Sequence, residues 1–258
     1  MPITEISGLL LAAALGGAIN AVAGGGTLVT FPTLLLFGTP SIIANATSTL
    51  ALVIGTSGSI YGFRSHLEPV KPWLRRFLPA SVLGGALGAI LLKLTSEQMF
   101  SKLVPFLILF ATLLFLAQSL FRKFAVQEHT KPHNPKWMLW GAILFQFGVA
   151  VYGGYFGAGI GILMLASLGL IGLGNIHEMN TLKTIMGSLI NGVAAVLFIF
   201  AGLIEWKKAG VMTIGAVAGY YLGAHWSQRI SQKRVRQLIT LIGFGLSGVT
   251  FYEEFFKK

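Results

Sequence analysis

The sequence predicts an all-α polytopic membrane protein built from two homologous repeats. Apolar residues make up 54% of the 258 positions, whereas only 10% are charged. No charged residue occurs from Ile6 to Phe63 or from Trp137 to Ile176, and an uncharged apolar run of about 18 residues is already typical of a membrane-spanning helix. A soluble domain of this size would need more polar residues to cover its surface.

The two halves of the chain are predicted to be copies of one unit. An ungapped comparison of the sequence with itself at a shift of 135 residues aligns Asn45 with Asn180 and Thr49 with Thr184. Four glycine pairs share this register: Gly24 and Gly159, Gly26 and Gly161, Gly84 and Gly219, Gly88 and Gly223. A register that holds over about 80 residues indicates duplication. The predicted parts are an N-terminal repeat (1–121), a linker (122–136) and a C-terminal repeat (137–258).

Each repeat begins with an apolar segment that glycines interrupt. In the first repeat, Ile6–Val22 leads through Ala23-Gly24-Gly25-Gly26-Thr27 to Leu28–Phe37. In the second, Met138–Tyr152 leads through a glycine-rich stretch ending at Gly161 to Ile162–Leu173. As one helix, residues 6–37 would be about 48 Å long, against a hydrocarbon core of about 30 Å. Because each glycine also weakens a helix by roughly 1 kcal/mol relative to alanine, we expect a helical hairpin with its glycine bend inside the membrane.

Three membrane-spanning helices are expected after each hairpin. They are Ser41–Phe63, Trp73–Leu92 and Phe100–Phe121 in the first repeat, and Met179–Leu203, Ala209–Trp226 and Val235–Phe255 in the second. Each unit then crosses an odd number of times, so the repeats should be inverted relative to each other. Inverted and parallel arrangements place equal numbers of basic residues inside, so the positive-inside rule does not separate them. We favour the inverted one, with both termini outside, because the parallel one exports the basic cluster Arg229–Arg236.

The composition also argues against several classes of protein. The net charge is +11, but the basic residues lie in short loops between apolar runs, as at cytoplasmic helix ends. Nucleic acid is therefore not an expected partner. The chain has no cysteine, which excludes disulfides and thiolate metal sites. No cofactor or metal is expected, and the predicted location is the bacterial inner membrane, with the lipid bilayer as the surrounding partner.

The two glycine bends are the candidate binding site for a small anion. A helix broken inside the membrane exposes backbone N–H groups and a positive dipole end, and glycine lets a ligand approach the backbone closely. Hairpins that enter from opposite faces would bring the bends together near the bilayer centre. The candidate residues are Asn20, Gly24, Gly25, Gly26, Thr27, Asn45, Thr47 and Ser48 in the first repeat, and Gly157, Gly159, Gly161, Asn180, Thr181, Lys183 and Thr184 in the second.

Alternatives stay open for some of these residues. Lys183 could balance the charge of an anion, or it could snorkel outward, because it lies only a turn or so into its predicted helix. The pairs Gly84/Gly88 and Gly219/Gly223 are interpreted as small residues that allow close helix packing. The chain has no Asp, and no Glu lies in the middle of a predicted helix. Proton-driven carriers commonly use such a buried carboxylate, so its absence favours export of an anion down the membrane potential.

The sequence motifs at both bends resemble those of the sulfite exporter TauE/SafE family. The first is Asn20-Ala21-Val22-Ala23-Gly24-Gly25-Gly26-Thr27, followed by Phe31-Pro32 and Ala44-Asn45-Ala46-Thr47-Ser48. The second is Tyr152-Gly153-Gly154-Tyr155-Phe156-Gly157-Ala158-Gly159-Ile160-Gly161, in which Ala158 replaces a proline often found in the family; Gly202–Trp206 also fits the family pattern. The resemblance covers nearly the whole chain. It implies a permease for sulfite, organosulfonates or related sulfur-containing anions, with no catalytic residue.

Two other functions are alternatives. Gly55-Thr56-Ser57-Gly58 has the GxSG form of a rhomboid-like intramembrane serine protease, whose chemistry would need Ser57 within hydrogen-bond reach of His225. His225 is predicted beside a basic loop, away from the membrane interior. A non-transporting membrane assembly subunit is the other alternative, although the five histidines form no ligand pair at helical spacing. The exact anion, the coupling ion and the oligomeric state, including a homodimer, stay open.

Overall fold

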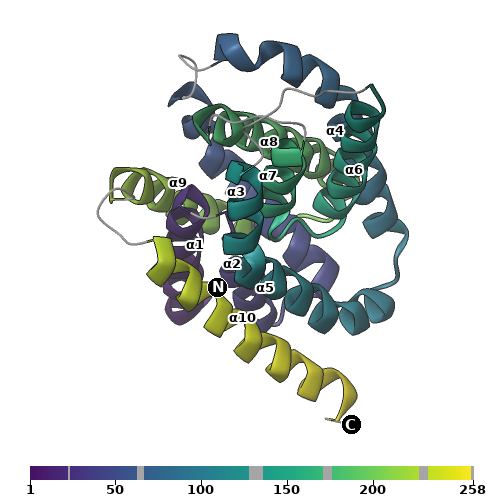
Figure 1. Cartoon of the computed structure of the whole chain (residues 1–258). Coiled ribbons are helices and arrows are strands. Elements are labelled where there is room, and N and C mark those ends of the chain that lie inside the picture. Colours follow the sequence, from purple (N-terminus) through teal and green to yellow (C-terminus); the bar gives the residue numbers. More distant parts are fainter. Residues whose placement is uncertain (23, 63–66, 128–135, 171–175, 227–231, 257–258) are drawn as a thin grey trace.

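The computed structural model describes all residues except 23, 63–66, 128–135, 171–175, 227–231 and 257–258, and the described residues fold into helices without strands (Figure 1). The helices follow in the order α1 (Ile3–Val22), α2 (Thr27–Leu36), α3 (Ser41–Gly62), α4 (Leu67–Leu94), α5 (Glu97–Gln127), α6 (Lys136–Tyr155), α7 (Ile160–Leu170), α8 (Ile176–Phe200), α9 (Trp206–Trp226) and α10 (Gln232–Phe255). The predicted all-α class is therefore confirmed.

The described helices have the length and surface of a membrane protein. Among them α1, α4, α5 and α8 are long and apolar enough to cross a bilayer. Large apolar side chains also stand exposed on the outside of the bundle, for example Leu83, Phe200 and Leu241. A water-soluble protein rarely exposes apolar surface on this scale. The chain is a multi-pass membrane protein.

The two broken segments fold back as hairpins. A methyl group added at Gly16 would lie 2.7 Å from Thr30 Cγ2, and one added at Gly8 would lie 2.7 Å from Phe37 Cζ. Positions that descend along α1 thus meet positions that ascend along α2, so the two helices are antiparallel. In the second half, α6 packs against α7 in the same order. The arms are unequal, because α1 and α6 have 20 residues each whereas α2 has 10 and α7 has 11.

Each long hairpin arm packs closely against a helix from the other half. Added methyl groups at Gly215 and Gly219 of α9 would overlap the carbonyl oxygens of Leu10 and Ala14 in α1. On α4, one at Gly84 would lie 2.7 Å from the Phe147 carbonyl oxygen, and one at Gly88 would overlap that of Val151. The residue numbers rise together in both pairs, so the paired helices run parallel. The packing interpretation of these glycines is confirmed.

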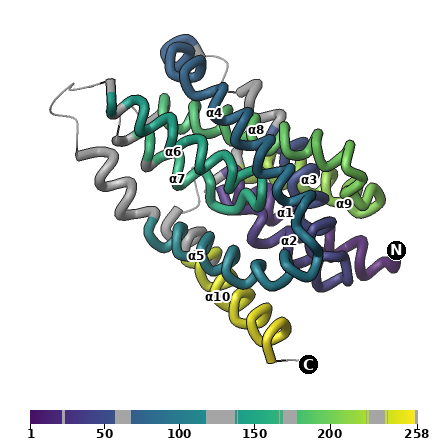
Figure 2. Tube along the Cα trace, turned by 90° about the vertical axis from the view of Figure 1, so that its right-hand side faces the viewer, coloured from purple at the N-terminus to yellow at the C-terminus, as the bar shows by residue number. Residues whose placement is uncertain are grey.

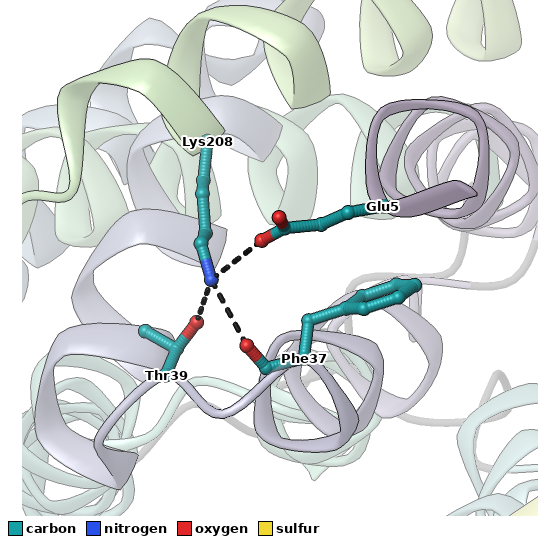
Figure 3. A network of polar contacts seen from close by, with 4 residues as sticks. All are labelled: Glu5, Phe37, Thr39 and Lys208. Atoms are coloured by element: carbon teal, nitrogen blue, oxygen red, sulfur yellow. Dashed lines mark hydrogen bonds and ion pairs between the residues drawn. The ribbon is translucent and has the colours of Figure 1, made fainter. Parts of the chain in front are cut away.

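A buried ion pair fixes the open end of the first hairpin (Figure 3). The Lys208 ammonium at the start of α9 lies 2.8 Å from the Glu5 carboxylate of α1, and each side chain is only 14% exposed. Lys208 also donates to the Phe37 carbonyl at 3.2 Å and to the Thr39 hydroxyl at 2.9 Å. These contacts join α1, the end of α2 and α9, so the hairpin is held at its base.

The helices α5 and α10 lie together at one edge of the bundle (Figure 2). The Ser247 hydroxyl donates to the Pro105 carbonyl at 3.1 Å, and the rings of Phe106 and Phe251 meet edge to face at 4.8 Å. α5 continues to Gln127, into the segment expected to be a linker. No Pro or Gly occurs from Arg122 to Gln127, and most of these residue types support a helix.

Candidate functional site

The first glycine bend closes the end of α1 through a left-handed residue. Gly24 has a φ of 73°, a conformation that glycine adopts without steric cost. Its N–H group contacts the carbonyl oxygens of Ile19 and Asn20, both at 3.2 Å. The chain then turns through Gly25 and Gly26, and α2 begins at Thr27. The predicted break between the two helices is thus where the glycines are.

The second bend uses two left-handed glycines. Gly157 has a φ of 84° and Gly159 a φ of 79°. Between them, Ala158 is buried, and its carbonyl accepts a hydrogen bond of 2.8 Å from the Tyr152 hydroxyl. This bond fixes the local backbone at the position where the family often has proline. α7 begins at Ile160, and Gly161 is its second residue.

The two bends meet at one aromatic side chain of α5. A methyl group added at Gly25 would overlap the ring of Phe115, and one added at Gly159 would lie 3.7 Å from Phe115 Cε2. Phe115 itself is completely buried. The ring therefore lies between the starts of α2 and α7, and it sets how closely these two helix N-termini approach each other.

Gly25→Ala is expected to lower the free energy of unfolding by about 1–3 kcal/mol, the usual cost of overpacking a core. The added methyl group cannot fit beside the Phe115 ring. Combining it with Phe115→Leu should cost less than the sum of the two single changes, because leucine leaves room for the methyl group. Thermal unfolding of the four proteins gives this coupling. Gly148→Ala is the control, since no atom lies within 4 Å of the methyl group there. Additive costs would contradict the contact.

Polar side chains of the first half surround the start of α2. The Asn20 amide nitrogen donates to the Tyr220 hydroxyl oxygen of α9, and the Asn20 Oδ1 atom lies 3.5 Å from the Gly26 nitrogen. Tyr220 is 6% exposed. Because the Tyr220 oxygen accepts from Asn20, its own O–H must point elsewhere, and no described residue accepts it. Tyr220 is a buried donor that sequence reasoning missed, since a tyrosine in a glycine-rich packing helix carries no motif.

Ser48 places the first turn of α2 within the bundle. Its hydroxyl lies 2.6 Å from the Thr30 hydroxyl, which in turn lies 3.1 Å from the Gly26 carbonyl oxygen. Ser48 is completely buried and is the eighth residue of α3, so it lies about 11 Å along the helix axis from the start. The break after α1 is therefore within the protein interior. Thr27, the first residue of α2, is partly buried.

Two candidate residues of α3 have their polar groups engaged elsewhere. The Thr47 hydroxyl accepts the Glu205 N–H at 3.1 Å, which fixes the approach to α9. The Asn45 amide nitrogen donates to the Tyr155 carbonyl at 2.9 Å, at the end of α6. Thr47 thus does not face either bend, whereas Asn45 joins α3 to the second one.

Lys183 lies beside the start of α7. Its Cδ atom would be 3.2 Å from a methyl group added at Gly161, so its aliphatic chain covers the first turn of that helix. The expectation that Lys183 lies about one turn into its helix is wrong, because α8 begins at Ile176 and places seven residues before it. That is about 11 Å of helix, which makes snorkelling harder. Lys183 is partly buried and forms no ion pair or hydrogen bond with another described residue.

Other polar residues of α8 complete the second bend. The Asn191 Oδ1 atom would lie 3.3 Å from a methyl group added at Gly157. Thr181 is completely buried, and Asn180 and Thr184 are partly buried. Because Asn191 is eight residues after Lys183 on the same helix, these two contacts show that α8 runs alongside the whole bend.

The structure gives no support to a hydrolytic site. The side chain of Ser57 lies outside the described residues, and His225 is exposed near the end of α9. Among the described residues, no group of three or more His, Asp or Glu side chains is arranged to hold a metal ion.

The fold and the bends together define a class: multi-pass α-helical membrane proteins with two interrupted helices, the arrangement that secondary transporters use around a binding site. The sequence matches the family described as sulfite exporter TauE/SafE over residues 9–250. The chain belongs to this family and is a membrane transporter.

Similar proteins carry the same general description. The chain is 30% identical to a "Probable membrane transporter protein" of Haemophilus influenzae over 92% of this chain and 90% of the relative. It is 26% identical to "Probable membrane transporter protein ORF9" of a Sinorhizobium species, over 93% and 89%. It is also 26% identical to "Probable membrane transporter protein YfcA" of Escherichia coli K12, over 95% and 89%. No solved structure matches the chain.

Proposed function

We propose that this protein is a permease that moves a small sulfur-containing anion, sulfite or an organosulfonate, outward across the bacterial inner membrane. The observation that carries the proposal is Lys183, a partly buried cation without a carboxylate partner among the described residues, beside the first turn of α7. A helix N-terminus is electropositive, and a nearby ammonium adds a full charge. A tetrahedral or pyramidal oxyanion suits such a cradle of N–H groups.

We further propose that the two halves are inverted repeats. The helix contacts support this, because α1 packs on α9 as α6 packs on α4, and α3 packs on α9 as α8 packs on α4. The Glu97 carboxylate at the start of α5 accepts hydrogen bonds from Ser41 and Ile42 at the start of α3. The end of α4 therefore lies on the face where the first hairpin opens. Because α6 runs parallel to α4, the second hairpin opens on the opposite face.

The repeats correspond best in two registers. α3 and α8 begin at Ser41 and Ile176, a shift of 135 residues, whereas α2 and α7 begin at Thr27 and Ile160, a shift of 133 residues. In the second register Gly24 corresponds to Gly157, and both are left-handed. The ungapped alignment of Gly24 with Gly159 is therefore displaced by two residues at the bend.

The proposed anion contacts are the N–H groups at Gly25, Gly26 and Thr27 in the first bend and at Gly159 and Gly161 in the second. Lys183 supplies the charge, and Tyr220 supplies a hydroxyl donor that Asn20 orients. Gly24 and Gly157 shape the bends, while Ser48 fixes the start of α2. Asn180, Thr181 and Thr184 belong to the helix that carries Lys183. An anion leaving an inside-negative cell gains about 2.3 kcal/mol per charge per 100 mV, which supplies a driving force for export.

The test is flux in proteoliposomes that contain only this protein. Sulfite, small organosulfonates, sulfate and acetate are compared, with and without an imposed membrane potential. Saturable flux of a sulfur oxyanion that speeds up when the trans side is made positive supports the proposal. Equal leakage of every anion, or none of any, contradicts it. The second outcome is also what an assembly subunit predicts.

Tyr220→Phe is expected to reduce anion flux about 10-fold, because one buried hydrogen bond to a charged group contributes about 1.5 kcal/mol. The change removes only the hydroxyl and keeps the ring that packs against Gly55. Tyr221→Phe is the matched control, since its neighbouring side chain is exposed on the outer surface of the same helix. Equal flux in both variants would remove Tyr220 from the site.

A further inference from the structure

One buried oxygen near the second bend lacks a partner. Asn45 on α3 is 1% exposed, and its amide nitrogen donates to the Tyr155 carbonyl at 2.9 Å. Its Oδ1 atom has no hydrogen-bond partner among the described residues. A buried acceptor without a partner costs free energy that a bound ligand can recover. The ligand must be a cation or a hydrogen-bond donor, because an oxygen acceptor repels an anion.

The neighbouring end of α6 supplies more oxygen atoms of the same kind. The last four carbonyls of a helix have no partner within it. Here the Tyr152 carbonyl accepts the N–H groups of Phe156 and Gly157, and the Tyr155 carbonyl accepts from Asn45. The carbonyls of Gly153 and Gly154 have no donor among the described residues. A helix C-terminus also carries negative partial charge, so the electrostatic field at this place favours a cation.

We propose that Asn45 Oδ1 and the carbonyl end of α6 form a site for one small alkali cation, Na⁺. All of these oxygens are neutral, which suits a monovalent ion better than Ca²⁺ or Mg²⁺, whose sites are built around carboxylates. In broken-helix transporters, C-terminal carbonyls coordinate a cation and N-terminal N–H groups hold an anion. The cation site belongs to the C-terminal end of α6, and the proposed anion cradle to the N-terminal end of α7. It is tested without any transported anion, so its failure and that of the anion permease are distinguishable.

The experiment measures the melting temperature of the purified full-length protein while NaCl replaces choline chloride at constant chloride. No sulfur-containing anion is present. A ligand that binds only the folded state stabilises it by mass action, so we expect a saturable rise of about 4 °C or more. Binding of radiolabelled sodium should approach one ion per chain. Identical melting curves in the two salts would overturn the proposal.

Variants then locate the ion. Asn45→Leu removes Oδ1 and should abolish the sodium-dependent rise. Asn45→Asp retains an oxygen, adds a negative charge and should lower the half-maximal sodium concentration about 10-fold; it decides the matter if Asn45→Leu does not fold. Gln146→Leu is the matched control, because Gln146 Oε1 is the other unpaired buried oxygen found in the described part of the chain and belongs to the middle of α6. Loss of the rise in Gln146→Leu but not in the Asn45 variants would refute the assignment.

Discussion

Replacing Lys183 with methionine should reduce anion flux by about 100-fold or more, while the protein still inserts and folds. Removing a charge that faces a buried counter-ion costs about 2–5 kcal/mol, and each 1.4 kcal/mol is a factor of ten. Methionine keeps the unbranched chain that covers Gly161, so the first turn of α7 stays covered. The measurement is the initial rate of sulfite efflux from proteoliposomes with equal amounts of inserted protein.

Two controls separate a site charge from a surface charge. Lys183→Arg preserves the charge and should retain most of the flux. Lys207→Met removes a lysine whose side chain is exposed at the start of α9, and it should leave the flux within about twofold, because an exposed charge is screened by solvent and salt. If Lys183→Met behaved like Lys207→Met, Lys183 would not act on the anion, and the snorkelling interpretation would hold.

Gly219→Leu should prevent stable folding, at a cost of more than about 3 kcal/mol, beyond the usual range for overpacking. Even a methyl group at this position would overlap the Ala14 carbonyl oxygen. A backbone atom cannot rotate out of the way as the end of a side chain can, so α1 and α9 would have to separate. The measurement is the yield of monodisperse protein in detergent and its melting temperature.

Gly210→Leu is the control for that change. It lies on the same helix, where no atom is within 4 Å of an added methyl group. The two substitutions change helix propensity equally, so the difference between them reports the contact with α1 alone. Similar yields and melting temperatures would show that α1 and α9 are not packed as closely as described.

The helical elements could be predicted well from the sequence because apolar periodicity and glycine breaks are local signals. The first short helix was expected at Leu28–Phe37 and is Thr27–Leu36. Glycines with no role at a bend, such as Gly219, were correctly interpreted as packing residues. The ends of α4 and α5 were placed too early or too late, because charged residues extend these helices beyond their apolar runs.

The site was predictable only in part. The glycines and Lys183 stand out because breaks and charges are rare in apolar segments. Tyr220 and Phe115 do not, since each acquires its role from a partner far along the chain: Asn20 is 200 residues from Tyr220, and Gly25 meets Phe115 across another helix. The ungapped self-comparison also aligned Gly24 with Gly159, because it could not detect a two-residue difference between the halves.

The sequence by itself determined that the chain is an apolar, multi-pass helical protein of one transporter family with glycine-broken segments, because hydrophobicity and backbone freedom belong to each residue separately. Only the tertiary structure decided which polar groups face one another. It engages the Asn45 nitrogen with Tyr155 while its oxygen is left without a described partner, turns Thr47 toward Glu205, and sets Lys183 beside Gly161. The physical reason is that hydrogen bonds and packing depend on distances of a few ångströms, which spacing along the chain does not encode.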